Sequence, residues 1–162
     1  EWGMDGEANA FLEEVLLWLS ENLPLNPNPK KLCWGDSRLG NVLFENFQVK
    51  SLLDWEMATI GDPLCDLAWG LTTDDVSSHG LNIEKLPGSI ANEEAIKFWE
   101  KNTGYSAENF FYYRILCLFK FSVIMIRVAK KLIHNEIMPL DSDFHVNNHV
   151  SNYLRQEFNE KN

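Results

Sequence analysis

Cysteine and basic side chains are scarce in this sequence. Three cysteines occur among 162 residues, an odd number, and all three have apolar neighbours: Cys33, Cys65 and Cys117. Buried thiols without disulfides, in a reducing compartment such as the cytoplasm, are the simplest interpretation. Lysine and arginine number 14 against 24 acidic residues, which gives a net charge of −10. An acidic surface repels the phosphate backbone, so this charge argues against general nucleic-acid binding.

Long uncharged hydrophobic runs are also missing, and we expect no secretory leader. The most apolar stretch, residues 110–129, is interrupted by three basic side chains, and it therefore predicts a core helix rather than a membrane span. Residues 1–10 lack the basic start and apolar run of a secretory signal. The chain begins at Glu1 rather than at methionine, which is typical of a fragment or a processed product.

The composition that remains is typical of one globular domain, with 45% hydrophobic and 23% charged residues. Hydrophobic periodicity predicts a mostly helical α+β fold with a small β-hairpin. We expect helices over residues 6–22, 63–71 with Asp62 as the N-cap, 92–102, 107–134 with Ser106 as a cap, and 143–159. We expect strands over residues 31–33, 42–44 and 49–53, with 42–53 as the hairpin, and a long loop over residues 72–91 that can include one short turn of helix.

The informative polar side chains lie between residues 33 and 69. Asp36 is followed by Asn41 on the same loop, and the hairpin then returns the chain so that Asp54 can face that loop. Phosphoryl transfer needs a carboxylate that positions the attacking hydroxyl, and oxygen ligands for Mg²⁺. One asparagine and two aspartates are a sufficient set on one side of a cleft. Turn and cap roles, which isolated aspartates usually have, are the alternative.

Four motifs in this region resemble those of the aminoglycoside phosphotransferase family, which includes choline kinase-like enzymes and is distantly related to protein kinases. In order, they are Trp34-Gly35-Asp36, Asn41, Leu53-Asp54-Trp55-Glu56 and Gly61-Asp62-Pro63-x-x-Asp66-Leu67-Ala68. The individual residues of these motifs are similar to those of the subgroup of kinase-like domains found with acyl-CoA dehydrogenases. The resemblance implies the C-terminal lobe of a protein kinase-like fold.

The resemblance also implies roles for individual residues. Asp36 would be the catalytic base or the residue that orients the hydroxyl, and Asn41 and Asp54 would bind Mg²⁺. Asp66 would brace the catalytic loop through hydrogen bonds from the next helix. Glu56 is a further candidate neighbour of the metal or the substrate. ATP or GTP would be the phosphoryl donor.

One departure from the family pattern is Trp34, which occupies a position where the family usually has histidine. In the relatives that histidine packs and hydrogen-bonds beneath the loop. A tryptophan fills the space but changes the polar contact. Arg38 is a candidate for contact with a phosphate, and pairing with an aspartate or glutamate is its expected role.

The second departure is the lobe that holds most of the nucleotide in such kinases. The sequence has no glycine-rich phosphate loop and no strand-borne lysine of a β-rich lobe. Residues 1–30 instead predict a helix and a proline-rich connector. Residues 31–71 would carry the catalytic loop, hairpin and metal loop, and residues 72–162 a helical substrate subdomain, all within a single domain.

We therefore predict a phosphotransferase that moves the γ-phosphoryl group of ATP or GTP to a hydroxyl of a small molecule, and that is inactive without the missing lobe. The alternative is a non-catalytic, pseudokinase-like binding module. Neither nucleic acid nor membrane is expected as a partner. The surface that would meet the missing lobe should expose apolar side chains, so we expect it to pair with a second copy or to be covered by residues 1–10.

Other polar residues have simpler interpretations. His145 and His149 are four residues apart on a predicted helix, a spacing that zinc can use, but without a third ligand a solvated helix face is favoured. Asp74 and Asp75 could attract a cationic substrate, and a solvated loop is the simpler interpretation. The aromatic residues are expected mainly in the core, and Trp69 is among them.

Overall fold

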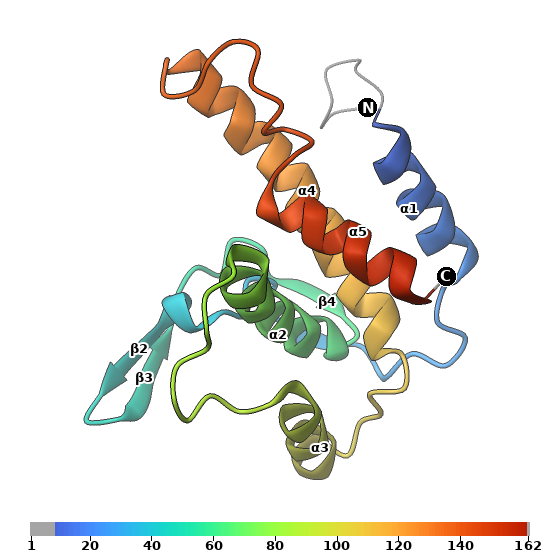
Figure 1. The fold of residues 1–162 in the computed structure, drawn as a ribbon. Helices are drawn as coiled ribbons and strands as arrows, with labels where there is room; N and C mark the ends of the chain where they lie inside the picture. Colours follow the sequence, from blue (N-terminus) through green and yellow to red (C-terminus); the bar gives the residue numbers. More distant parts are fainter. Residues whose placement is uncertain (1–8, 162) are drawn as a thin grey trace. The chain divides into compact units, whose positions relative to one another are not determined.

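The computed structural model describes residues 9–161 of the chain (Figure 1). These residues form two compact units. One unit is Pro24–Arg114, and the other combines the described residues up to Leu23 with those from Ile115 onward. The structure is mostly helical with small antiparallel sheets, which confirms the predicted fold class.

The first unit contains two antiparallel pairs of short strands. β2 (Val42–Glu45) and β3 (Gln48–Leu52) form the predicted hairpin. The two residues of its turn both have positive φ, of 50° and 61°, which matches the twist of the strands: Asn46 and Phe47. β1 (Lys31–Cys33) pairs with β4 (Thr59–Gly61), a strand too short for periodicity to indicate.

α2 (Leu64–Ser78) is longer than predicted and leads into the short helix η2 (His79–Leu81). The loop expected over residues 72–91 is therefore wrong at its beginning, because residues 72–78 continue the helix. The polar residues that indicated a loop are buried within this unit: Thr72, Thr73, Asp75 and Ser78. Burial of polar groups leaves no hydrophobic period for a sequence pattern to detect.

Asp75 explains how a polar helix can be buried. Its carboxylate is 2% exposed and accepts hydrogen bonds from Arg114 Nη1 at 2.6 Å, Lys85 Nζ at 2.7 Å and Asn92 Nδ2 at 2.7 Å. Burial alone would raise the pKa of Asp75, but the hydrogen bonds and charges of these partners outweigh burial and lower it. The solvated-loop interpretation is therefore wrong for Asp75, since its charge is buried and compensated.

α3 (Asn92–Thr103) agrees with the helix predicted over residues 92–102. Two glutamates in its first turn complement the helix dipole. Gly104 ends the helix with a φ of 72°, a left-handed conformation that glycine adopts at no steric cost.

The second unit is built from α1 (Ala10–Glu21), α5 (His149–Lys161) and most of α4 (Phe110–His134). α1 begins at Ala10 because the Asn9 side chain accepts a hydrogen bond from the backbone N–H of Leu12 at 3.2 Å. Residues 6–8 of the predicted helix lie outside the described residues. Apolar side chains from all three helices are buried: Leu12, Val15, Leu19, Ile115, Leu118, Ile126, Val150, Leu154 and Phe158.

Both C-terminal helices begin later than predicted. α4 follows a turn in which the backbone N–H of Glu108 donates to Ser106 Oγ at 3.1 Å. α5 begins at His149 rather than at residue 143, because Asn148 Oδ1 accepts a hydrogen bond from the backbone N–H of Ser151 at 3.0 Å and caps the helix. Within residues 9–161, no helix combines the length and the apolar character needed to cross a bilayer.

The three cysteines form no disulfide within the described residues. Cys33 and Cys117 are buried, as predicted, whereas Cys65 is half-buried. Burial, together with the negative charge of Asp66, raises the pKa of the Cys33 thiol. Cys33 therefore lacks the lowered pKa that a reactive cysteine needs.

Asp75→Ala should lower the free energy of unfolding by about 3–5 kcal/mol, because it removes the carboxylate that compensates the buried Arg114 guanidinium. Asp74→Ala is the matched control, since this neighbouring side chain is 60% exposed and its loss should cost about 1 kcal/mol or less. Urea denaturation of both variants measures the difference. Equal losses would contradict the stabilising role of the buried network.

Candidate active site

The segment from Trp34 to Arg38 is held on the first turn of α2. The backbone N–H groups of Trp34 and Gly35 donate to the two carboxylate oxygens of Asp66, at 2.6 and 2.8 Å. Ser37 Oγ donates to the backbone carbonyl of the same residue at 2.6 Å. Hydrogen bonds to an ionised carboxylate are among the stronger ones in proteins. One helical residue thus fixes this loop at three positions.

Two glycines allow this close packing. Gly35 has a φ of +88°, and a Cβ atom there would lie 2.2 Å from the backbone oxygen of Met57. Gly70 lies on α2, where a Cβ atom would lie 2.8 Å from the backbone oxygen of Ser37. Both distances are too short for any side chain, so the loop can approach its neighbours only because these positions are glycine.

Asp36 is buried, and both oxygens of its carboxylate accept hydrogen bonds. Oδ1 accepts a hydrogen bond from Trp69 Nε1 at 2.7 Å. Oδ2 accepts one from Asn41 Nδ2 at 2.6 Å and another from Arg38 Nε at 3.0 Å. The sequence assigned Trp69 only to the core. Its place three residues after Asp66, on the same face of the helix as this bracing residue, is the signal that could have identified it.

The same contacts set the charge of Asp36. Burial by itself would raise the pKa of this carboxyl, but hydrogen bonds from Trp69, Arg38 and Asn41, together with the positive charge of Arg38, lower it below its ordinary value. Asp36 is therefore ionised at neutral pH and acts as an acceptor of hydrogen bonds. Of the two contacts considered for Arg38, the structure contains the pair with a carboxylate.

Asn41 ends the short helix η1 (Leu39–Asn41) and is buried. Its Nδ2 donates both to the backbone oxygen of Asp36 at 3.1 Å and to the carboxylate. Its Oδ1 accepts no hydrogen bond from any described residue and so remains available as an acceptor. The backbone N–H of Leu53 donates to the Asn41 backbone oxygen at 2.8 Å, which ties this loop to the chain just before Asp54.

Asp54 follows β3 in a left-handed conformation, with a φ of 58°. Aspartate is one of the few residues other than glycine that tolerates this region. The carboxylate is exposed and makes no hydrogen bond or ion pair within residues 9–161. The structure connects Asp54 to Asn41 through the backbone of Leu53, and not through a contact between the two side chains.

Trp34 supports the same segment from beneath. Its Nε1 donates to the backbone oxygen of Leu53 at 2.7 Å, and its ring lies 5.8 Å from the ring of Trp55 at an angle of 33°. The side chain that stands in place of the family's histidine therefore makes a polar contact with the residue before Asp54. Because of this contact, the replacement does not leave the loop unsupported.

The oxygen atoms near this loop fit a hard divalent cation. Asn41 Oδ1 and the Asp54 carboxylate are oxygen donors with no competing partner among the described residues. Mg²⁺ is commonly held by one or two protein ligands plus water and substrate phosphates. Within residues 9–161, no three His, Cys, Asp or Glu side chains gather into a metal site. Glu56 is exposed, and its side chain makes no hydrogen bond or ion pair with this loop among the described residues.

Asp62 anchors the proline-rich connector to α2. Its carboxylate accepts hydrogen bonds from the backbone N–H groups of Leu64 at 2.9 Å and Asn28 at 2.8 Å, and from the Tyr113 hydroxyl at 3.2 Å. Burial and the charge of Asp62 raise the pKa of Tyr113. The predicted N-cap is displaced by one residue: Pro63 is the N-cap of α2, and Asp62, one position earlier, accepts the hydrogen bond from Leu64. Asn28 carried no signal in the sequence.

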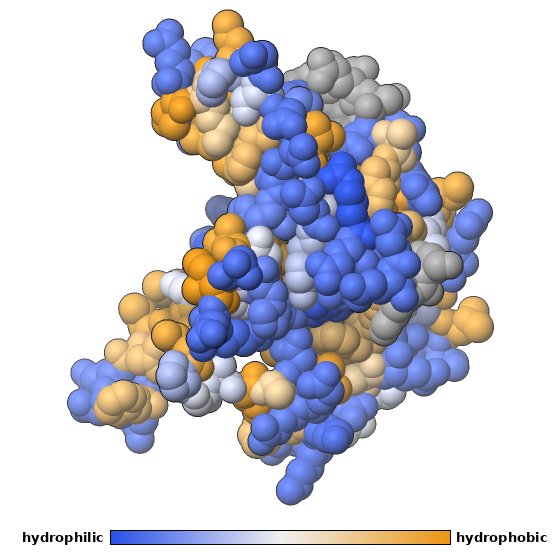
Figure 2. All heavy atoms as spheres, viewed as in Figure 1, coloured by the Kyte–Doolittle hydropathy of each residue, from blue (hydrophilic) through white to orange (hydrophobic). Residues whose placement is uncertain are grey.

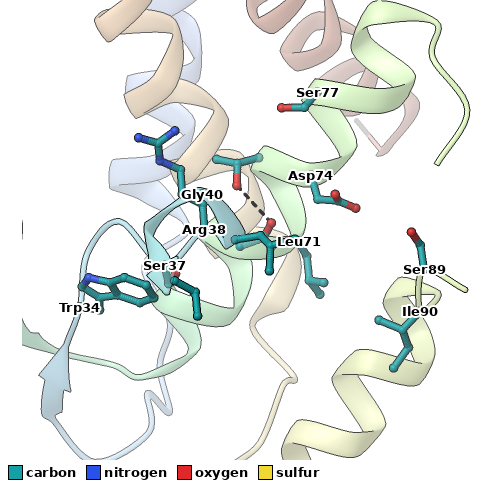
Figure 3. Close-up of a pocket in the computed structure, with 13 residues that line it drawn as sticks. Trp34, Ser37, Arg38, Gly40, Leu71, Asp74, Ser77, Ser89 and Ile90 are labelled. Carbon is teal, nitrogen blue, oxygen red and sulfur yellow. Dashed lines mark hydrogen bonds between the residues drawn. The ribbon is translucent and has the colours of Figure 1, made fainter. Parts of the chain in front are cut away.

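A pocket of about 550 Å³ opens next to the loop that follows Asp36, although Asp36 itself is not one of its lining residues (Figure 3). Its walls come from the loop after Asp36, from α2 and from residues 89–90. Ser37 and Arg38 line it, and Figure 3 shows the side chains of Asp74 and Ser77 on the α2 side with Ser89 and Ile90 facing them. This volume lies within the usual range for small-molecule sites.

The histidine pair has no metal-binding geometry. His145 lies in a turn before α5, whereas His149 begins that helix, so the two do not share one helical face. No metal-binding group of side chains includes them among the described residues. Burial lowers the pKa of His149, which favours the neutral ring.

Residues 2–97 match the phosphotransferase enzyme family. Acyl-CoA dehydrogenase family member 11 of Pongo abelii is 33% identical over 124 residues, which cover 70% of this chain and 16% of that protein. The Gallus gallus protein of the same name is 33% identical over 138 residues, covering 76% and 18%. The Homo sapiens protein is 46% identical over 59 residues, covering 35% and 8%. The chain thus spans less than a fifth of these relatives' length.

A solved structure from Ralstonia eutropha JMP134, assigned to the aminoglycoside phosphotransferases, matches 94% of this chain with a TM-score of 0.69. The sequence identity is 19%, and the match covers 47% of that chain. At this level of identity the likeness concerns the fold alone.

Gly35→Ala should destabilise the protein more than Gly88→Ala. Both glycines have positive φ, +88° and +90°, but a Cβ atom at Gly88 would meet nothing within 4 Å. Gly88→Ala therefore measures backbone strain alone, about 1–2 kcal/mol. Gly35→Ala adds the clash with Met57, about 1–3 kcal/mol more. Thermal and urea denaturation measure both variants, and equal effects would exclude the tight packing of this loop.

Proposed function

The chain belongs to the phosphotransferase enzyme family, and from this premise we propose that it carries the catalytic loop of a kinase acting on small molecules. The proposed reaction transfers the γ-phosphoryl group of ATP or GTP to a hydroxyl group of the acceptor. The observation that carries the proposal is the Asp36 carboxylate, ionised and held by three donors, with the unengaged Oδ1 of Asn41 beside it.

Asp36 orients the acceptor hydroxyl in this mechanism. The hydroxyl donates a hydrogen bond to the carboxylate, which fixes the direction of the attacking oxygen. The carboxylate receives the proton as the new bond to the γ-phosphorus forms, the bond from this phosphorus to the β–γ bridging oxygen breaks, and the nucleoside diphosphate leaves. The lowered pKa of Asp36 makes it a weak base before the reaction. Phosphoryl transfer passes through a loose transition state that needs little activation of the nucleophile, so positioning is the larger contribution.

Asn41 and Asp54 would hold Mg²⁺ through Oδ1 and the carboxylate. When bound, the ion neutralises charge on the nucleotide phosphates. The Asn41 amide group would have two tasks in this arrangement, since Nδ2 fixes Asp36 and Oδ1 would be a ligand of the metal. Arg38, half-exposed and paired with Asp36, adds positive charge next to the reacting groups.

We propose that residues outside these 162 complete the nucleotide site. The sequence offers no glycine-rich loop or strand-borne lysine for the phosphates. The relatives are several times longer than this chain, which is consistent with this proposal. The chain alone should therefore bind ATP weakly and turn over slowly or not at all.

The exposed apolar side chains of the hairpin fit a missing neighbour. Figure 2 shows hydrophobic residues over this region, and Leu43, Phe44, Phe47 and Val49 are all more than half exposed. Exposed apolar surface of this kind marks a contact site. Pairing with a second copy, or cover by the first ten residues, stays a prediction, and residues 1–8 lie outside the described part of the chain.

The acceptor is proposed to be a hydroxyl compound of metabolism or an acyl-CoA-linked compound. The name shared by the relatives supports this proposal, because it places similar sequences beside acyl-CoA dehydrogenases. The fold likeness to an aminoglycoside phosphotransferase carries no information about the acceptor.

Asp36→Asn in the whole protein that contains this chain should reduce Mg²⁺-dependent phosphoryl transfer by about 10²-fold or more. The amide keeps the size of the side chain but cannot accept the proton. Asp141→Asn, an exposed acid in the second unit, is the matched control and should retain the wild-type rate. Transfer of ³²P from ATP to hydroxyl compounds gives the readout. Equal rates for wild type and Asp36→Asn would favour the non-catalytic, pseudokinase-like alternative.

A further inference from the structure

The pocket next to the loop that follows Asp36 has one carboxylate in its wall, and that carboxylate is already paired. Asp74 is the single acidic side chain lining the pocket within the described residues. Lys85 Nζ contacts Asp74 Oδ2 at 2.7 Å and Asp75 Oδ1 at 2.7 Å. Arg114 binds the other oxygen of Asp75 at 2.6 Å. The negative charges of these two carboxylates therefore equal the positive charges of these two cations on this side of the pocket.

Lys85 is fixed in this position rather than mobile on the surface. Its side chain is only 19% exposed, whereas Asp74 is 60% exposed. Burial alone would lower the pKa of Lys85, but the hydrogen bonds and charges of Asp74 and Asp75 raise it above its ordinary value. The ammonium group therefore stays charged and holds its place, because the buried Asp75 is anchored from the other side by Arg114 and Asn92.

The opposite wall of the pocket is also neutral overall. Arg38 is the single basic side chain lining the pocket within residues 9–161, and its Nε is paired with Asp36. The remaining walls are mostly apolar, formed by Trp34, Leu39, Val42, Leu71 and Ile90. Ser77 and Ser89 add hydroxyl groups that form no side-chain hydrogen bond with the described residues. Apolar walls with a few convergent polar groups are typical of small-molecule sites.

We propose that this pocket binds an uncharged hydroxyl compound with an aliphatic segment, that it disfavours cationic compounds, and that Lys85 sets this selectivity. The proposal rests on the proposed function, in which Asp36 receives the acceptor hydroxyl. An ammonium group entering the pocket would meet no uncompensated carboxylate, and would lie near the Lys85 charge. Aminoglycosides carry several ammonium groups, so they are poor acceptors for a pocket with this charge balance.

Two six-carbon alcohols that differ only at the far end test the selectivity: 1,6-hexanediol and 6-aminohexan-1-ol. Binding is followed in the whole protein by NMR titration of the Ile90 methyl group, which lines the pocket. The wild-type protein should bind the diol at least about threefold more tightly than the amino alcohol. Equal or tighter binding of the amino alcohol would overturn the proposal, and so would the absence of any Ile90 shift with either compound.

Lys85→Met should reverse the preference, because it exposes the Asp74 charge to the pocket while Asp75 keeps Arg114 and Asn92. The ratio of the two dissociation constants should shift toward the amino alcohol by at least about threefold, in line with the modest strength of exposed charge pairs. The Asp74→Asn/Lys85→Met double variant should return the preference to the diol. An unchanged ratio in Lys85→Met would contradict the role of Lys85.

Asp74→Asn covers the case in which Lys85→Met fails to fold, since Asp74 is 60% exposed and Lys85 keeps its contact with the buried Asp75. It should move the preference further toward the diol, and a move toward the amino alcohol would overturn the proposal. The phosphoryl-transfer assay of the wild type and of Asp36→Asn, run beside these titrations, separates the proposed function from the proposed selectivity of the pocket. If transfer is absent from the wild type while the binding ratios are as expected, the proposed function fails and the pocket's selectivity stands.

Discussion

The Asp66 carboxylate is the interaction on which the candidate site depends. It accepts hydrogen bonds from two successive backbone N–H groups, at Trp34 and Gly35, and so fixes the direction in which the chain enters the loop. Asp36 comes next in the sequence, so the backbone direction fixed at Trp34 and Gly35 sets the orientation of Asp36. A helix is a rigid support, so the position of the loop is set by α2 and not by the loop's own flexibility.

The site is built in two steps from this support. The backbone places Asp36, and then three side chains hold its carboxylate: Trp69, Arg38 and Asn41. The donors keep the group ionised although it is buried. The amide of Asn41 uses its nitrogen for this purpose and leaves its oxygen without a hydrogen-bond donor among the described residues. Positions and charges are thus prepared before any ligand binds, which is what transfer through a loose transition state requires.

The parts of this site that the sequence predicts depend on residues that lie close together along the chain. The hairpin, and the order of Asp36, Asn41 and Asp54, are local features that turn residues and short periods specify. Trp69 lies 33 residues from Asp36, and only tertiary packing brings the two together. The length of α2 was missed for a similar reason, because the cations that compensate Asp75 come from distant parts of the first unit.

The most direct test of the phosphoryl-transfer centre is the location of the metal. Mn²⁺ substituted for Mg²⁺ in the nucleotide complex of the whole protein broadens NMR signals near the ion. We expect selective broadening of the Asn41 side-chain amide and of the Asp54 backbone amide in the wild-type protein, and loss of the Asp54 broadening in Asn41→Ala. Broadening centred on other residues, or unchanged in Asn41→Ala, would contradict the assignment of this loop as the catalytic centre.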